Sequence, residues 1–135
     1  MGASDLKRIG DLQLQILRAL WSLGATSIRD VVDYLHRGGS EHAYTTIATM
    51  LKKMEGRGLV ERLGEGRQQR YRASVSEPEL RSGALSDMLE RLFTGSLSGL
   101  VRHALGDQKI DSEELDELER VIAQHKSNPK KRPKP

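Results

Sequence analysis

Three apolar stretches with helical spacing, followed by two strand-like runs, occupy the first 73 residues. Apolar residues recur every three or four positions after Asp11, after Ser27 and from about Ala43 to Glu55, and glycines end all three stretches. The runs LVERL and QRYRA then flank the loop GEGRQ, whose glycines are typical of a hairpin turn. Three helices followed by a two-stranded hairpin is the element order of a winged helix-turn-helix.

The third of these helices has one apolar face and one face of hydroxyl and amino groups. At about 100° per residue, Thr45, Thr49, Lys52 and Lys53 lie opposite the apolar side chains, with Thr46 at the margin. Threonine is a mediocre helix former, and a purely solvated face would be better built from Ala, Glu or Gln. Threonine hydroxyls donate to phosphate oxygens, and their methyl groups contact the thymine methyl in the major groove. We therefore predict that these five residues contact DNA; a merely solvated face is the alternative.

The hairpin is rich in arginine. Gly64 and Gly66 let the loop tip turn tightly, and we expect Arg67 between them and the second strand to contact a phosphate. Arg70 and Arg72 share one face of their strand, whereas Tyr71 points to the other side and should pack inward. Charge that protects an edge strand from aggregation is an alternative explanation for Arg70 or Arg72, and it explains Arg67 less well.

The charge of the chain is segregated along its length. Residues 1–75 hold 12 Lys and Arg against 8 Asp and Glu, residues 76–125 hold 5 against 11, and residues 126–135 hold 5 basic residues and no acidic one. A basic first half is typical of proteins that bind a polyanion, whereas the acidic second part would be repelled by nucleic acid. At 135 residues the chain is long enough for one domain of usual size or two small ones.

Composition and motifs argue against several other classes of protein. The absence of cysteine excludes disulfides, thiolate metal sites and cysteine nucleophiles. The four histidines lack the spacing of metal ligands, and no GxSxG, Walker or GxGxxG motif occurs, so we expect no enzyme activity, no metal and no cofactor. No apolar run reaches the ~18 residues needed to span a bilayer, and the first residues do not form a signal peptide. We expect a cytoplasmic protein without direct membrane binding.

Four segments resemble the penicillinase-repressor family, the BlaI, MecI and CopY group of bacterial transcriptional repressors. The segments are IGDLQLQILRALWSLGATSIRDVVDYL, AYTTIATMLKKMEGRGLVER, RYRA and GSLSGLV, and the resemblance extends from residue 9 to about 122. It implies a winged helix joined to a small helical dimerisation domain, and a dimer that blocks transcription at a palindromic operator in double-stranded DNA. By the motif match, the DNA-reading helix of the family falls on Thr45, Thr46, Thr49 and Lys52, and its wing on Arg67.

The second half predicts three amphipathic helices, which begin after Ser76, Ser96 and Asp111. About fifty residues are few for an independent core, and an identical partner would cover the apolar stripes best through a two-fold interface. Folding back onto the winged helix within one chain is the alternative. The predicted dimerisation residues are the apolar ones of these stripes: Leu85, Met88, Leu89, Leu92, Leu97, Leu100, Val101, Leu115, Leu118, Val121 and Ile122.

The chain departs from the family pattern at the sites that respond to a signal. The resemblance implies release by an upstream signal and a membrane sensor peptidase as a partner. Antibiotic-responsive members are cleaved at an Asn-Phe bond in the second dimerisation helix, and the matching positions here are His103 and Ala104, which do not predict the same cut. Copper-responsive members carry a C-terminal cysteine pair, and the lack of cysteine excludes copper sensing by that route.

The sequence thus predicts a mostly α fold with a small β-hairpin, divided into three parts. Residues 1–75 form a winged-helix DNA-binding domain, residues 76–125 a helical dimerisation domain, and residues 126–135 a disordered basic tail. The predicted function is that of a dimeric repressor on an inverted-repeat operator. The alternative is a winged helix that serves as a protein-interaction module, in which the threonine face contacts protein.

Overall fold

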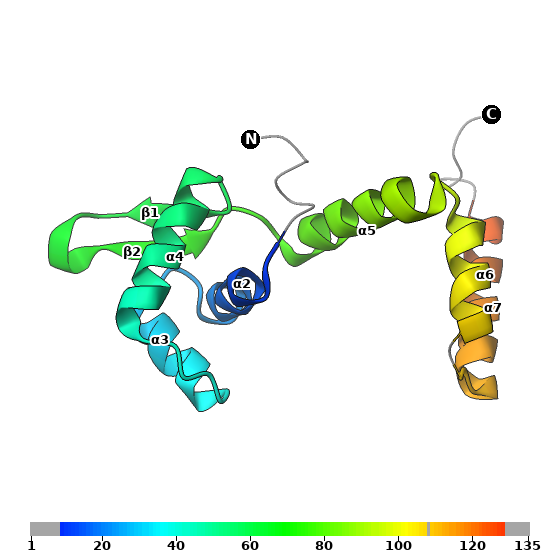
Figure 1. Ribbon diagram of the computed structural model, residues 1–135, viewed down its shortest axis with the longest axis horizontal. Coiled ribbons are helices and arrows are strands. Elements are labelled where there is room, and N and C mark those ends of the chain that lie inside the picture. Colours follow the sequence, from blue (N-terminus) through cyan, green and yellow to red (C-terminus); the bar gives the residue numbers. More distant parts are fainter. Residues whose placement is uncertain (1–8, 108, 129–135) are drawn as a thin grey trace. The chain divides into compact units, whose positions relative to one another are not determined.

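The computed structural model describes residues 9–107 and 109–128. Packing divides the chain into two compact units, Met1–Gly95 and Ser96–Pro135. Within the described residues, the first unit contains α2 (Asp11–Leu23), α3 (Ile28–Arg37), α4 (Tyr44–Gly56), β1 (Val60–Leu63), a short 3-10 helix η1 (Gly66–Gln68), β2 (Arg70–Ala73) and α5 (Glu77–Phe93), and the second unit contains α6 (Leu97–Asp107) and α7 (Ser112–Ser127) (Figure 1). No helix in this part of the chain is long and apolar enough to cross a membrane.

Local caps explain where three of the helices begin. Ser27 precedes α3, Ser76 precedes α5 and Asp111 precedes α7, and each side chain accepts a hydrogen bond from the backbone N–H three residues further on. The Glu79 carboxylate accepts a bond of 3.0 Å from the Ser76 N–H, which completes a capping box. These three helix starts agree with the sequence prediction.

Helix α2 begins without a side-chain cap. Asp11 is the first residue of α2, and Gly10 occupies the cap position. The Gly10 N–H donates a hydrogen bond of 3.2 Å to the Gln13 side chain. Asp11 still lies in the first turn, where its negative charge interacts favourably with the helix dipole.

The core of the first unit lies among α2, α3, α4 and the hairpin, which pack pairwise against one another. Tyr71 points into it from β2 and is 2% exposed, as the alternation of the strand predicted. Eight apolar side chains of the described residues are completely buried: Ile16, Leu17, Ala19, Val31, Ile47, Leu51, Met54 and Leu59. The mostly α fold with a winged helix and a small hairpin is therefore confirmed.

The hairpin pairs β1 with β2 antiparallel, with Arg62 opposite Tyr71, and extends away from the helices (Figure 1). The connector before α3 forms an isolated β-bridge with the hairpin, because the Thr26 and Tyr71 backbones exchange hydrogen bonds of 2.8 and 2.9 Å. Gly64 has φ +76°, and a Cβ on it would lie 2.7 Å from the Gln68 carbonyl oxygen. Only glycine fits there, so the sequence determines the turn that carries Arg67.

The first turns of α5 belong to the winged-helix core. Val75 and Leu80 are buried in the same cluster as α2 and α4 residues, and the Trp21 indole N–H donates a hydrogen bond of 2.8 Å to the Val75 carbonyl. Packing therefore groups α5 with the first unit up to Gly95, whereas we expected the division after residue 75. Helical periodicity alone did not indicate that Leu80, an apolar residue near the start of α5, faces the winged helix.

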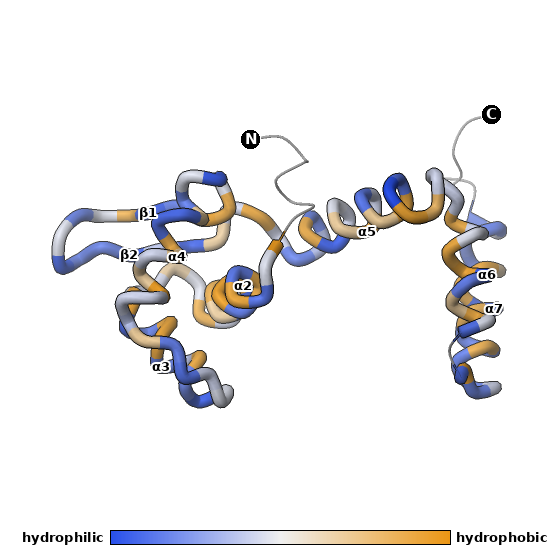
Figure 2. The backbone as a smooth tube through the Cα atoms, viewed as in Figure 1, coloured by the Kyte–Doolittle hydropathy of each residue, from blue (hydrophilic) through white to orange (hydrophobic). Residues whose placement is uncertain are grey.

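Helices α6 and α7 have no buried residue among those that the structure describes. Figure 2 shows apolar and polar residues alternating along both helices and along the later turns of α5. Helix α7 continues through Ser127 and so includes the first two residues of the expected tail, residues 126–135. The part of that tail from 129 to 135 lies outside the described residues.

Candidate nucleic-acid interface

Helix α4 presents one fixed apolar face to the core and one polar face to solvent. Ile47, Leu51 and Met54 are completely buried, which fixes the rotation of the helix about its axis. The residues predicted to contact DNA are all exposed on the other face: Thr45, Thr46, Thr49, Lys52 and Lys53. Within the described residues, none of these five side chains has a hydrogen-bond or ion-pair partner. The structure brings them together on one accessible surface of a rigidly held helix.

The start of α4 adds two features that the sequence reading missed. Its cap residue is Ala43, which has no side-chain acceptor, so the first backbone N–H groups of α4 have no capping side chain. Arg29 of α3 lies over the Tyr44 ring, with the guanidinium carbon 5.0 Å from the ring centroid. Uncapped N–H groups beside a guanidinium form a surface suited to an anion such as a phosphate. The lack of a capping side chain could have been recognised from the sequence, because Ala43 has no side-chain acceptor.

The turn between α3 and α4 is tied down by two histidines. The His36 ring nitrogen Nε2 lies 2.8 Å from the His42 carbonyl oxygen, and the Ser40 hydroxyl lies 2.7 Å from His42 Nδ1. Both rings are exposed and near the start of α4. Their hydrogen bonds place both histidines in the turn that positions α4.

The arginines of the hairpin differ in how they are paired. Arg72 bonds to Glu61 on the opposite strand at 2.8 Å, and Arg62 lies 3.5 Å from the Glu55 carboxylate. Arg67, in η1 at the loop tip, is exposed, and within the described part of the chain it has no such partner. An ion pair across the strands depends on which residues stand opposite each other. The number of arginines in the hairpin sequence did not indicate which of them would be paired. Arg70 is also exposed and has no ion-pair partner among the described residues, but its charge helps to lower the pKa of Asp30, so Arg67 is the hairpin arginine whose charge is most available to a ligand.

A recess of about 630 Å³ separates the hairpin loop from the start of α3. Arg67 and Arg70 line one side, and Ser27 and Asp30 line the other. A hydrogen bond of 2.6 Å from the Thr26 hydroxyl, together with bonds from Ser27, lowers the pKa of Asp30 below its usual value. Because Asp30 therefore stays ionised, the recess has charge of both signs.

The predicted dimerisation residues of α5 lie on its later turns. Leu85 is 43% and Leu92 71% exposed, and Met88 and Leu89 are half-buried. The earlier turns differ, because Leu80 and Gly83 are buried there and Leu80 belongs to the core of the first unit. Only the part of α5 beyond Gly83 thus leaves its apolar side chains accessible.

The predicted dimerisation residues of the second unit are also accessible. Leu97 is 57% and Ile122 53% exposed, and none of the set is buried. The members on α6 are Leu97, Leu100 and Val101, and those on α7 are Leu115, Leu118, Val121 and Ile122. At the two positions that we matched to the cleavage site of the antibiotic-responsive members, the His103 ring lies 2.9 Å from the Asp107 carboxylate and Ala104 is half-buried.

Comparison with known proteins places these features in a family. The family model described as penicillinase repressor matches residues 9–124. The penicillinase repressor of Bacillus licheniformis is 25% identical over 125 residues, which cover 93% of this chain and 97% of that protein. The transcriptional regulator BlaI of Mycobacterium tuberculosis is 28% identical over 132 residues, or 96% and 94% of the two chains. An uncharacterised 16.5 kDa protein of Latilactobacillus sakei is 30% identical over 106 residues, or 78% and 71%. The chain belongs to the penicillinase-repressor family.

Proposed function

We propose that the chain is a transcriptional repressor that binds double-stranded DNA as a dimer at an inverted-repeat operator. The observation that carries the proposal is the polar face of α4, where Thr45, Thr46 and Thr49 are exposed without partners among the described residues while the opposite face is locked in the core. A helix held in this way can enter the major groove and present hydroxyls to base edges. The name of the Bacillus licheniformis relative, penicillinase repressor, supports the same role.

Different residues of this surface would make different kinds of contact. Thr45 and Thr49 would read base edges, since their short side chains allow the helix to approach closely. Lys52, Lys53 and Arg67 would neutralise phosphates, which adds affinity without sequence information. The uncapped N–H groups of α4 would bind a further phosphate through the positive end of the helix dipole.

A second copy of the chain is the partner that best suits the exposed apolar residues of α5, α6 and α7. Leu92, Leu97 and Ile122 are each more than half exposed, although apolar side chains of this size are usually buried. A two-fold interface would cover the same stripes on both copies and hold two reading helices on one duplex. The operator would then be an inverted repeat with half-sites about 34 Å apart, or a multiple of that.

Release from DNA would follow a signal, through a route other than the Asn-Phe cut of the antibiotic-responsive members. His103 and Ala104 occupy the matching positions, so a membrane sensor peptidase would have to recognise a different bond. Mass spectrometry of the protein from induced and uninduced cells tests this expectation. A fragment that ends at His103 in induced cells would contradict it.

A gel shift tests the central part of the proposal. Full-length protein at physiological salt should retard a duplex from its own promoter region, and an unrelated duplex of equal length should not compete effectively. The alternative function, a winged-helix protein-interaction module, predicts equal and weak binding to both duplexes. That result would overturn the proposal, because phosphate contacts alone do not distinguish sequences.

A further inference from the structure

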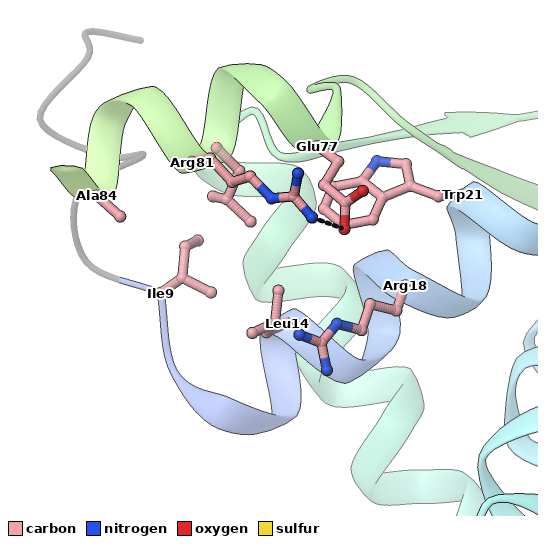
Figure 3. Close-up of a pocket in the computed structure, with 8 residues that line it drawn as sticks. Ile9, Leu14, Arg18, Trp21, Glu77, Arg81 and Ala84 are labelled. Carbon is pink, nitrogen blue, oxygen red and sulfur yellow. Dashed lines mark ion pairs between the residues drawn. The ribbon is translucent and has the colours of Figure 1, made fainter. Parts of the chain in front are cut away.

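The first unit contains a half-open pocket of about 260 Å³ between α2 and the first turns of α5 (Figure 3). It is remote in sequence from α4 and the hairpin loop, and the proposed DNA contacts do not use it. Ligand sites in proteins are typically concave, mostly apolar, and furnished with a few polar groups that orient the ligand. The composition of this pocket follows that pattern.

Apolar side chains form the wall of the pocket. Leu80 is 7% exposed, and Ile9, Leu14 and Trp21 are half-buried around it, with Ala84 at the edge. The Trp21 ring cannot turn freely, since its indole N–H is hydrogen-bonded to the Val75 carbonyl at 2.8 Å. A wall that is already in place before binding reduces the entropy lost when a ligand enters.

Two guanidinium groups and one carboxylate line the same pocket. Arg81 lies 3.5 Å from the Glu77 carboxylate, but their side chains are 76% and 43% exposed, so this pair contributes little free energy. Figure 3 shows Arg81 and Glu77 on the α5 side and Arg18 on the α2 side. Among the described residues, Arg18 has no hydrogen-bond or ion-pair partner. The pocket therefore carries one positive charge in excess, with a guanidinium group that no described carboxylate neutralises.

We propose that this pocket binds a small organic acid, with the apolar body against Trp21 and Leu80 and the carboxylate on Arg18 and Arg81. Guanidinium groups bind carboxylates through paired charge-assisted hydrogen bonds. The carboxylate of the ligand would replace Glu77 as the partner of Arg81, since the Arg81–Glu77 pair is weak. The volume lies just below the ~300 to 1,000 Å³ of sites for drug-sized ligands, which restricts the ligand to a small acid.

Trp21 allows a direct test, because it is the only tryptophan of the chain. The full-length protein is titrated with phenylacetate, cyclohexanecarboxylate and hexanoate, and in parallel with the neutral amide of each acid. We expect a saturable change of tryptophan fluorescence with at least one acid, and about tenfold weaker binding of its amide because the charge-assisted bonds are lost. No saturable response to any of the three acids, or equal affinity for acid and amide, would contradict the proposal.

Substitutions locate the bound acid. Arg18→Gln should weaken binding of the acid about tenfold and leave binding of the amide unchanged. Ala84→Leu should fill the edge of the pocket and weaken both. The matched control is Arg91→Gln, since Arg91 lies on the same helix, is paired with Asp87 at 3.1 Å and does not line the pocket. Equal effects of Arg18→Gln and Arg91→Gln would overturn the assignment.

The chain itself is the competing occupant of the pocket. If a second copy covered it, the fluorescence of Trp21 would change on dilution through the range in which the protein associates, without any acid present. We expect no such change. A change on dilution would show that the pocket belongs to an interface between copies and would contradict the proposal.

Binding of an acid would also affect DNA binding, a step that rests on the proposed function. The ligand would bridge α2 to the start of α5, and α5 carries predicted dimerisation residues on its later turns, so it would alter how the two reading helices are held. We expect a saturating acid to change the operator affinity of the wild type several-fold and that of Arg18→Gln little. Unchanged operator affinity with the acid bound would overturn this step, whereas a failed gel shift without acid would overturn the proposed function.

Discussion

The winged-helix part of the first unit and the helices α6 and α7 bury their apolar side chains to very different extents. In the former, residues such as Leu51 and Ile47 are completely buried, whereas no described residue of α6 or α7 is buried and Ile122 is 53% exposed. Burial of apolar surface is the main driving force of folding and of association. The winged helix therefore has its own core, and the later helices have apolar surface still to be covered.

This difference teaches that amphipathic stripes of similar appearance serve two purposes. On α4 the stripe fixes a helix inside one chain, so that the opposite face is presented rigidly. On α6 and α7 we propose that the stripe is the interface with a second copy. Substitutions in the two regions should therefore differ in whether their effects depend on protein concentration.

The largest effect should come from a charge placed in the proposed interface. Ile122→Asp should abolish the dimer at micromolar concentration, because an unpaired buried charge costs several kcal/mol. Loss of the second reading helix should then weaken operator binding by about 10²- to 10⁴-fold. Sedimentation and gel shifts measure the two effects. The neighbouring exposed residue provides the control, Ala123→Asp, which should remain dimeric; a dimeric Ile122→Asp variant would remove α7 from the interface.

A smaller effect, on stability, should come from the core of α4. Leu51→Ala should lower the free energy of unfolding by about 2 to 5 kcal/mol, because it leaves a cavity at a completely buried position. The exposed neighbour gives the control, Lys53→Ala, which should change it by less than about 0.5 kcal/mol. Urea unfolding measures both. Equal effects would show that the two faces of α4 are not distinguished as described.

Loss of one hydroxyl from the polar face should have a moderate effect on DNA binding alone. Thr49→Ala should weaken binding to the operator by about 1 to 3 kcal/mol and barely change binding to random DNA, because base contacts carry the sequence information. The stability of the fold should not fall, since Thr49 is exposed. Competition gel shifts measure both affinities. Equal losses on the two DNAs would mean that Thr49 touches only the backbone.

The smallest effect should be that of the hairpin tip. Arg67→Ala should weaken binding to all sequences and reduce the salt slope of log K by roughly 0.9 per site, hence about twice that for a dimer. Arg72→Ala is the matched control, because Arg72 is already paired with Glu61 at 2.8 Å and should change the slope less. Binding titrations over a range of salt concentrations measure the slopes. An unchanged slope for Arg67→Ala would exclude Arg67 from the interface.

Much of the fold follows from short-range signals in the sequence. Ser27, Ser76 and Asp111 begin helices where the sequence placed them, because a cap depends on an oxygen and an N–H only three residues apart. The exposed face of α4 was likewise predictable from helical periodicity, since a helix with one apolar stripe buries that stripe. Helical periodicity therefore predicted that the candidate contact residues lie on the exposed face of α4, and their contacts with DNA stay a prediction.

The features that sequence reasoning missed depend on contacts between distant segments. Leu80 belongs to an apolar stripe, yet periodicity does not say that it packs on α2 and not on a partner. The bond between Trp21 and Val75 joins residues 54 positions apart. The pairing of Arg72 with Glu61 follows from the strand register. These three contacts determine the wall of the pocket, the extent of the first unit and which arginine of the hairpin is paired across the strands, and none has a local signature.

Selection of binding sites from a pool of random duplex DNA tests the central claim most directly, that two copies place two α4 helices on one operator. The full-length protein should enrich an inverted repeat with half-sites about one helical turn apart, or a multiple of that. The Ile122→Asp variant should fail to enrich it. Enrichment of a single asymmetric site, or of no sequence at all, would contradict the account.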